Sequence, residues 1–197
     1  MPTSKSSTAP EHAIVAGADY PVRAVHEPRF RRSREWADKH IPKAMALVRE
    51  MIAGKHPWPL FVFGDAGAGK TGLALMLVDW AKGEYFTQAE WVRTCREAEF
   101  GDLRTSVGYK LHLRDIRKGW EHAPVAVLDE LGTRMTVSDH AYESVQWAVD
   151  ARQGLPTVFV SNLDLGGLRK VFDDRIASRL SAGTVMQLSG DHRIKRT

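Results

Sequence analysis

The sequence Gly-Asp-Ala-Gly-Ala-Gly-Lys-Thr at residues 64–71 constrains the fold more than any other feature of the chain. It matches the phosphate-binding pattern G-x-x-x-x-G-K-[ST], and it lies between an apolar run at 60–63 and a helical pattern at 70–81. Glycines permit the tight bend that turns successive backbone N–H groups toward one phosphate, and the following helix adds its positive dipole end. The motif therefore predicts a strand, a P-loop and a helix of a P-loop NTPase.

The motif also predicts individual roles in binding ATP and Mg²⁺. Lys70 is expected to reach the β- and γ-phosphates, and the Thr71 hydroxyl is expected to complete the Mg²⁺ shell. The alternative is a chance glycine-rich turn, which would occur in roughly one chain in a hundred of this length. The predicted nucleotide-binding residues of the loop are Gly64, Asp65, Ala66, Gly67, Ala68, Gly69, Lys70 and Thr71.

Two carboxylates follow a second apolar run, in the sequence Val-Ala-Val-Leu-Asp-Glu at 125–130. Asp129 at the end of this strand is predicted to hold a water of the Mg²⁺ shell. Glu130 points to the other side of the strand end and is predicted to polarise the attacking water as general base. The alternative is a solvated acidic loop that follows a core strand.

A third apolar run, at 157–161, ends in Asn162. Its side chain is placed to hydrogen-bond the γ-phosphate or the attacking water. From spacing alone, a turn residue or a cap for the helix near Asp164 is an equally good interpretation.

The segment 173–183 carries Arg175 and Arg179, which are four residues apart and share one helix face. Ile176 and Leu180 share another face, which would anchor the helix in the domain. The pair is interpreted as a source of an arginine finger for a neighbouring subunit's nucleotide. The alternative is two surface arginines matched by the acidic residues at 173 and 174.

Strand and helix patterns alternate along the chain, which predicts an α/β fold with a parallel sheet and helices on both faces. Residues 1–27 are expected to form a flexible tail, and residues 28–197 a single domain. Strands are expected at 60–63, 84–86, 125–128, 157–161 and 185–188. Helices are expected at 41–53, 70–81, from 88 onward after a capping box, 138–152, after 164, and 173–181.

Composition excludes several classes for this chain of 197 residues. A single cysteine, Cys95, cannot form an intrachain disulfide or a cysteine zinc cluster, and it fits a reducing cytoplasm. No apolar run approaches the roughly 18 residues of a membrane span, so no membrane partner is expected. A net charge of +4 permits a polyanionic partner without demonstrating one.

With these elements in order, the chain resembles the AAA+ ATPases of the DnaC/DnaI helicase-loader group and the related IstB-type transposition ATPases. The resemblance runs from about residue 30 to 193 and is carried by 61–74, 125–133, 149–165 and 173–183. It implies a five-stranded sheet with no separate helical lid. It also implies that Asn162 is sensor 1, that Arg179 is the arginine finger with Arg175 as the second basic residue, and that Arg193 is a sensor 2 arginine. About 27 residues precede it, too few for the loaders' helicase-gripping domain.

The segment between Trp91 and Trp120 is basic, and in the family this region binds single-stranded DNA. Its alternative role is a solvated helical face with aromatic core anchors. The basic residues are Arg93, Arg96, Arg104, Lys110, Arg114, Arg117 and Lys118, interleaved with Phe100 and Tyr109 and opposed by four acidic residues.

Three functions remain open. The first is an ATPase related to replication helicase loaders, which assembles through its arginine finger on single-stranded DNA, with a hexameric helicase as partner. The second is an IstB-type helper on duplex DNA, and the third is a monomeric P-loop phosphotransferase.

Overall fold

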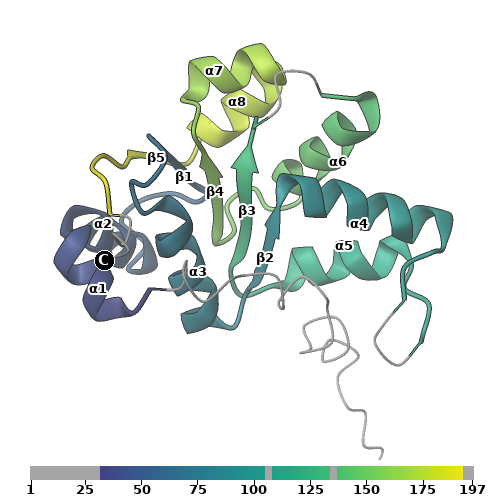
Figure 1. Cartoon of the computed structure of the whole chain (residues 1–197), viewed down its shortest axis with the longest axis horizontal. Coiled ribbons are helices and arrows are strands. Elements are labelled where there is room, and N and C mark those ends of the chain that lie inside the picture. The colour runs from purple at the N-terminus through teal and green to yellow at the C-terminus, as the bar shows by residue number, and fades with distance from the viewer. Residues whose placement is uncertain (1–31, 105–107, 134–136, 193–197) are drawn as a thin grey trace, which may run out of the picture.

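The computed structural model describes residues 32–104, 108–133 and 137–192 (Figure 1). Its centre is a five-stranded parallel sheet with the strand order β2-β3-β4-β1-β5. The strands are β1 (Leu60–Phe63), β2 (Glu84–Thr87), β3 (Ala126–Leu131), β4 (Thr157–Ser161) and β5 (Thr184–Gln187). All five predicted strands are thus present, and the predicted fold class is confirmed.

Eight helices occupy the described part of the chain. They are α1 (Arg34–His40), α2 (Pro42–Ile52), α3 (Lys70–Ala81), α4 (Gln88–Phe100), α5 (Leu113–His122), α6 (Asp139–Asp150), α7 (Leu165–Val171) and α8 (Asp174–Ser181). Helix α3 matches its predicted bounds, and α4 begins at the predicted capping box of Thr87 and Glu90. Within residues 137–192, no helix follows β5.

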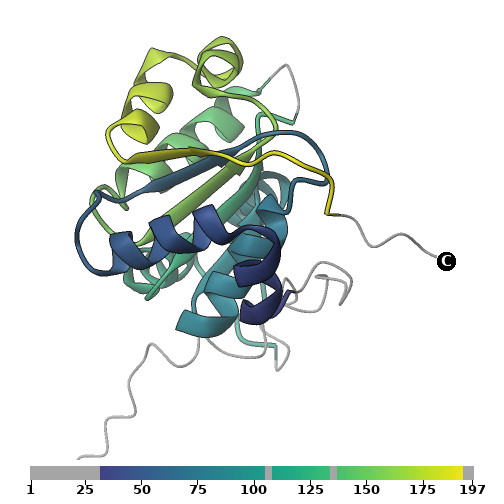
Figure 2. The ribbon, with the colours of Figure 1, turned by 90° about the vertical axis from the view of Figure 1, so that its left-hand side faces the viewer.

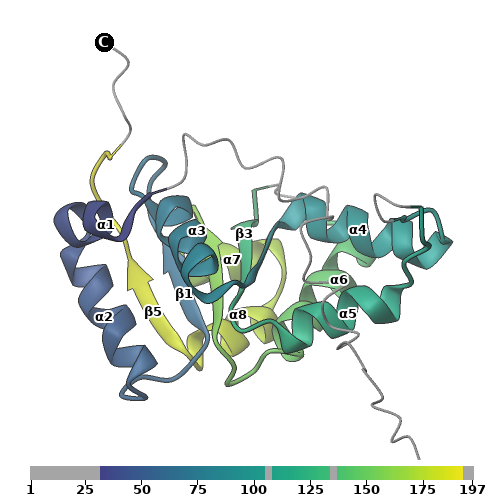
Figure 3. The same cartoon turned by 90° about the horizontal axis from the view of Figure 1, so that it is seen from below.

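Helices cover both faces of the sheet because the strands alternate apolar side chains between two cores (Figure 2). Leu60 and Val62 of β1 face the core formed with α1, α2 and α3. Phe61, between them, faces the second core, to which α4, α5, α6 and α8 contribute. Figure 3 shows α1 and α2 at one end of the molecule and α4 and α5 at the other.

The buried Arg152 was not predicted, since the sequence places it at the exposed end of a helix. It is only 1% exposed, and its guanidinium donates to the carbonyls of Trp120, Glu121, Ala123 and Pro156 and to the Thr157 hydroxyl, at 2.6–3.0 Å. These contacts tie the end of α5 to the start of β4. Burial lowers the pKa of Arg152 to about 10, so it stays charged at neutral pH.

Candidate functional site

The P-loop connects β1 to α3 at the carboxyl end of the sheet. Gly67 and Gly69 have φ values of 93° and 90°, in the left-handed region that favours glycine. A Cβ on Gly64 would lie 1.9 Å from the carbonyl oxygen of Leu188, so the backbones approach too closely for any side chain there. The predicted glycines are therefore required by the observed loop.

Lys70 begins α3 and bends back over the loop. Its Nζ donates to the carbonyl oxygens of Gly64 at 2.7 Å and Asp65 at 2.8 Å. The residue is 7% exposed, and burial lowers the pKa of its amine, opposed by the charges of Asp129 and Asp65. The ammonium is thus fixed at the concave side of the loop, where the motif predicts phosphate.

Asp129 is the most heavily hydrogen-bonded carboxylate of the site. Thr71 Oγ1 donates to its Oδ2 at 2.8 Å, Tyr85 Oη donates to the same oxygen at 2.7 Å, and the Glu130 N–H donates to Oδ1 at 2.6 Å. The residue is 2% exposed, and burial raises the pKa of its carboxyl while the three hydrogen bonds oppose that rise. The predicted metal residues Thr71 and Asp129 are therefore brought into contact.

The structure adds Tyr85 to this candidate site, although no sequence pattern points to it. Burial raises the pKa of its phenol, and the nearby Asp129 charge raises it further. The hydroxyl therefore remains a neutral donor at any physiological pH. The only local sign is its position in a strand that neighbours β3, where Tyr85 is the register partner of Val127.

Glu130 projects from the end of β3 and is exposed. Its φ of 61° is unusual for a residue other than glycine, and the pairing of β3 with β4 shifts register between Leu128 and Leu131. At this irregularity the side chain of Glu130 is exposed, whereas that of the preceding Asp129 is buried. Partial burial of the carboxyl, together with the charges of Asp129 and Glu90, raises the pKa of Glu130.

Asn162 lies exposed just beyond β4, at the same edge of the sheet as the P-loop. Its neighbours form the turn: Ser161 Oγ accepts from the Leu163 N–H at 2.9 Å, and the Asp164 side chain caps α7. The alternative that Asn162 caps this helix is therefore wrong.

The two arginines of α8 share one carboxylate on α6. Arg175 Nη2 lies 2.8 Å from Asp150 Oδ2, and Arg179 Nε lies 3.2 Å from Asp150 Oδ1. The acidic partners differ from the expected ones, because Asp173 caps α8 and Asp174 pairs with Arg169. The alternative of surface arginines matched by carboxylates of the same protomer therefore stays open, with Asp150 as the partner. Both guanidiniums are about half exposed, so they remain accessible from outside the protomer.

Three aromatic rings lie beside the P-loop. Trp36 and His40 of α1 stack with their centroids 4.9 Å apart, and His192 lies 5.9 Å from Trp36, edge to face. A Cβ on Gly69 would lie 3.2 Å from Trp36 Cη2, which places the cluster directly at the loop. The backbone N–H of His192 donates to the Gly67 carbonyl at 2.9 Å. Arg193, the expected sensor 2 residue, lies outside the described residues, as does the expected tail at 1–27.

The basic segment is only partly available to a ligand. Trp91 and Trp120 are buried core residues, and Arg117 lies 4.7 Å from the Trp147 ring, with its Nε buried. Phe100 and Tyr109, by contrast, are 70% and 74% exposed.

No helix in the described ranges is long and apolar enough to cross a membrane.

Comparison with solved structures identifies the fold. AMPPCP-bound DnaA from Aquifex aeolicus superposes with a TM-score of 0.62 at 16% identity, over 77% of this chain and 47% of that one. The replication initiator DnaA bound to AMPPCP and single-stranded DNA gives a TM-score of 0.62 at 17% identity, with the same coverage. DnaI gives a TM-score of 0.62 at 20% identity, over 83% of this chain and 95% of that one.

This chain spans about half the length of the initiator structures that it matches. No protein-family model and no curated protein matches its sequence. At these identities the likeness establishes the architecture alone. The chain has the five-stranded α/β fold of the AAA+ P-loop domains of DnaA and DnaI.

Proposed function

We propose that this protein is a Mg²⁺-dependent ATPase of the AAA+ family. The observation that carries the proposal is the 2.8 Å hydrogen bond between Thr71 on the P-loop helix and Asp129 at the end of β3. It places a hydroxyl and a carboxylate side by side at the phosphate loop, and these are suitable oxygen ligands for a Mg²⁺ ion that keeps several waters. Bound Mg²⁺ would neutralise charge on the β- and γ-phosphates.

Other groups of the chain are proposed to bind the phosphates, activate the attacking water and hold the adenine base. Lys70 exchanges its two carbonyl partners for phosphate oxygens, and the N-terminus of α3 adds further N–H donors. Glu130 accepts a proton from the attacking water, for which its raised pKa makes it a better base. Asn162 orients that water or the γ-phosphate from the end of β4. The rings of Trp36, His40 and His192 offer a stacking surface for the adenine base.

Arg179 is proposed to act on the nucleotide of a neighbouring protomer, with Arg175 assisting it. Both guanidiniums are about half exposed on α8, where each pairs with Asp150 of α6. A charge supplied from outside can contribute several orders of magnitude to the rate of phosphoryl transfer. Hydrolysis then requires assembly into a homo-oligomer.

Single-stranded DNA is the proposed polymer on which the protein assembles, in a role related to replication helicase loading in the cytoplasm. Phe100 and Tyr109 offer exposed rings for base stacking, and Arg93 and Arg114 add exposed guanidiniums, 62% and 77% accessible. A solved structure with the same fold is that of a DnaA initiator bound to single-stranded DNA.

The first experiment separates nucleotide binding from hydrolysis. Lys70→Ala is expected to abolish ATP binding in calorimetry, because it removes a charge-assisted contact to phosphate. Glu130→Gln is expected to bind ATP normally and to hydrolyse it about 10²-fold more slowly or worse. Glu121→Gln, an exposed change on α5, is the matched control. Unchanged turnover in Glu130→Gln would place the base elsewhere.

The second experiment tests the arginine finger. Arg179→Ala alone is expected to bind ATP but hydrolyse it poorly, whereas Lys170→Ala on the neighbouring helix α7 keeps wild-type activity. Mixing Arg179→Ala with Glu130→Gln should restore activity, because an intact Glu130 site then faces an intact Arg179. Hydrolysis that is linear in protein concentration, with no rescue on mixing, would contradict action between subunits and favour a monomeric phosphotransferase.

The third experiment identifies the polymer. Stimulation of ATPase activity by an oligonucleotide such as poly-dT, with loss in Phe100→Ala or Tyr109→Ala, supports the single-stranded DNA role. Stimulation by duplex DNA alone would favour an IstB-type helper. A pull-down with the hexameric replicative helicase tests the loader partnership directly.

A further inference from the structure

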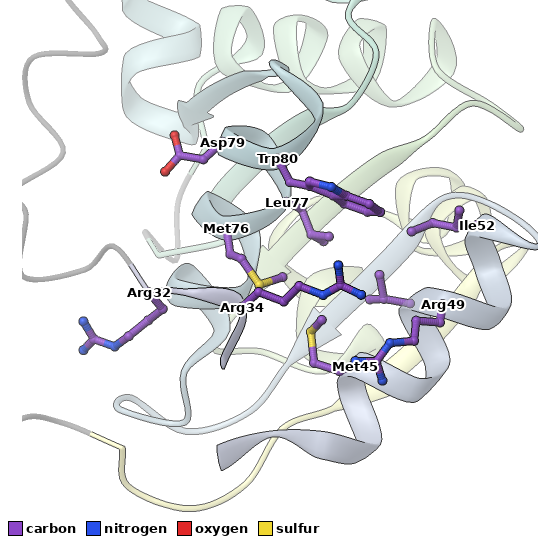
Figure 4. Close-up of a pocket in the computed structure, with 10 residues that line it drawn as sticks. Arg32, Arg34, Met45, Arg49, Ile52, Met76, Leu77, Asp79 and Trp80 are labelled. Atoms are coloured by element: carbon purple, nitrogen blue, oxygen red, sulfur yellow. The ribbon is translucent and has the colours of Figure 1, made fainter. Parts of the chain in front are cut away.

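An apolar groove lies between α2 and α3, on the side of these helices that faces away from the sheet (Figure 4). It encloses about 220 Å³. Its floor and walls are apolar, and they are formed by Met45, Val48, Ile52, Met76, Leu77 and Trp80. We call it the α2–α3 groove.

Two large apolar side chains remain exposed at its rim. Trp80 is 59% exposed and Ile52 is 52% exposed, whereas Met45 and Leu77 beneath them are 4% and 3% exposed. An exposed apolar surface that continues into a cavity is unusual on a soluble domain unless something binds there. Met45 and Met76 line the groove with flexible thioethers, which adapt to differently shaped apolar groups.

The volume suits one large side chain. An engineered apolar cavity of about 150 Å³ holds a benzene molecule, so this groove has room for a leucine or an aromatic ring. Of its six apolar lining residues, only Trp80 offers a side-chain hydrogen bond, through its indole N–H. A nucleobase would lose most of the hydrogen bonds of its edges there, which favours a hydrocarbon group instead.

Arginines border the apolar surface. Arg34 reaches across the groove from α1 in Figure 4, with its guanidinium carbon 5.9 Å from the Trp80 ring, while Asp79 points away. Arg49 of α2 lies on the other side and forms an ion pair with Asp38. A guanidinium beside an apolar wall is weakly hydrated and offers paired N–H donors to a carboxylate. Three arginines (Arg32, Arg34 and Arg49) thus line the groove against one aspartate, Asp79. This excess of positive charge favours a ligand that carries negative charge next to an apolar anchor.

From this geometry we infer that the α2–α3 groove docks a segment of a partner protein that inserts one large apolar side chain flanked by carboxylates. The apolar side chain fills the cavity beside Trp80 and Ile52, and the carboxylates pair with Arg34 and Arg49. A short amphipathic segment laid between two helices is a recurring mode of recognition. The groove uses none of the residues assigned to nucleotide, metal or DNA.

A library of random 12-residue peptides displayed on phage and selected against the full-length protein tests this chemistry without assuming a partner. We expect the selected peptides to share a Leu, Phe or Trp flanked by Asp or Glu. Binding of a synthetic selected peptide should weaken at least tenfold in Trp80→Ala and in Arg34→Glu. Leu155→Ala and Lys43→Glu, which change an exposed apolar side chain and an exposed cation outside the groove, are the matched controls.

Methionine-methyl NMR locates the bound peptide. The peptide should shift the methyl signals of Met45 and Met76 saturably and leave that of Met186 on β5 unchanged. The ATPase rate of Trp80→Ala and Arg34→Glu should equal that of the wild type, so the result is independent of the proposed ATPase mechanism.

Several results would overturn the inference. These are basic consensus peptides, selected peptides that bind both groove variants as well as the wild type, or no enrichment at all. Shifts of Met45 and Met76 that grow with protein concentration alone would make a second copy of this chain the occupant. Trp80-dependent binding of phosphatidylserine vesicles or of oligo-dT, without peptide binding, would replace the protein partner by a membrane or by nucleic acid.

Discussion

Tyr85→Phe removes a single hydrogen bond from the centre of the proposed metal site. The phenol is 8% exposed and its hydroxyl donates to Asp129 Oδ2 at 2.7 Å. The substitution keeps the ring and therefore the packing of β2. Asp129 retains its bonds from Thr71 and from the Glu130 N–H. If Mg²⁺ engages the Thr71 hydroxyl, Tyr85 becomes the main side-chain donor that orients the Asp129 carboxylate.

The magnitude follows from the charge on the acceptor. A hydrogen bond to a charged group contributes about 1.5–3 kcal/mol. For a domain of this size that corresponds to a fall in melting temperature of about 3–12 °C. Groups that orient a metal ligand typically change metal affinity by about 10–100-fold. Tyr85→Phe should therefore shift the Mg²⁺ dependence of ATP hydrolysis to concentrations at least about tenfold higher.

The pH dependence has a definite sign. The Tyr85 bond favours the ionised form of Asp129 and so lowers the pKa of that carboxyl, against the larger rise caused by burial. Removing the bond raises the folded-state pKa of Asp129 further. The stability lost in Tyr85→Phe should be largest at neutral pH and should shrink as pH falls through that folded-state pKa, where the carboxyl becomes neutral in both proteins.

The assay is thermal unfolding followed by circular dichroism between pH 4 and 8, together with Mg²⁺ titration of the ATPase rate. Tyr109→Phe, at a residue that is 74% exposed, is the matched control and should change neither measurement. A Tyr85→Phe protein with wild-type melting temperature and wild-type Mg²⁺ dependence would refute the role assigned to this hydroxyl.

Three further predictions concern charged groups. Arg152→Met should lower the free energy of unfolding by more than about 3 kcal/mol in urea titrations, because several buried carbonyls lose their donor. Arg152→Lys should recover part of that lost stability, and a loss below about 1 kcal/mol in Arg152→Met would contradict the prediction. Asp129→Asn should have a higher melting temperature than the wild type at pH 7, and the two melting temperatures should converge near pH 4. The reason is that the pKa of Asp129 is raised, which means that its charged form destabilises the folded state. A lower melting temperature of Asp129→Asn at pH 7 would argue against this. Asp150→Asn should change the free energy of unfolding by less than about 1 kcal/mol, because the ion pairs that it removes are exposed. It should nevertheless alter how the rate of ATP hydrolysis depends on protein concentration, since it releases Arg175 and Arg179. An unaltered concentration dependence would show that Asp150 does not position the two arginines.

The sequence predicts a segment correctly where its capping, turn and apolar patterns all indicate the same secondary structure. Helix α3 runs over Lys70–Ala81 as expected, because the glycines before it and the apolar residues within it specify the same structure. Strand β3 continues to Leu131, beyond the expected end at 128. A register shift between Leu128 and Leu131 keeps the strand paired with β4 across two acidic residues, a type of residue more typical of a loop. Helix α1 was not expected, since its seven mostly polar residues carry no apolar periodicity.

The P-loop residues and Asp129 are candidates that the sequence alone offers, because each belongs to a contiguous pattern whose chemistry is local. Tyr85 and Asp150 were not identified, because their roles depend on contacts 44 residues away on β3 and 25 residues away on α8. No sequence pattern distinguishes this tyrosine in a strand, or this aspartate at the end of a helix, from others that lack such contacts. Only the folded structure brings Tyr85 to Asp129, and Asp150 to the arginines of α8.

The contact of Asp150 with both arginines bears on how the proposed assembly would be switched on. An exposed ion pair of this kind contributes only about 0–1 kcal/mol, because water competes for both charges. A guanidinium that meets the phosphates of a neighbouring, partly desolvated nucleotide forms stronger charge-assisted and often bidentate bonds. Transfer of Arg179 from Asp150 to phosphate is therefore favourable, yet in the separate protomer Asp150 keeps the side chain ordered on α8. In the proposed assembly, the same carboxylate would limit the entropy lost when the protomers associate, and its ion pair is weak enough to release the arginine. ATP bound in one protomer would then stabilise the contact of that protomer with the next.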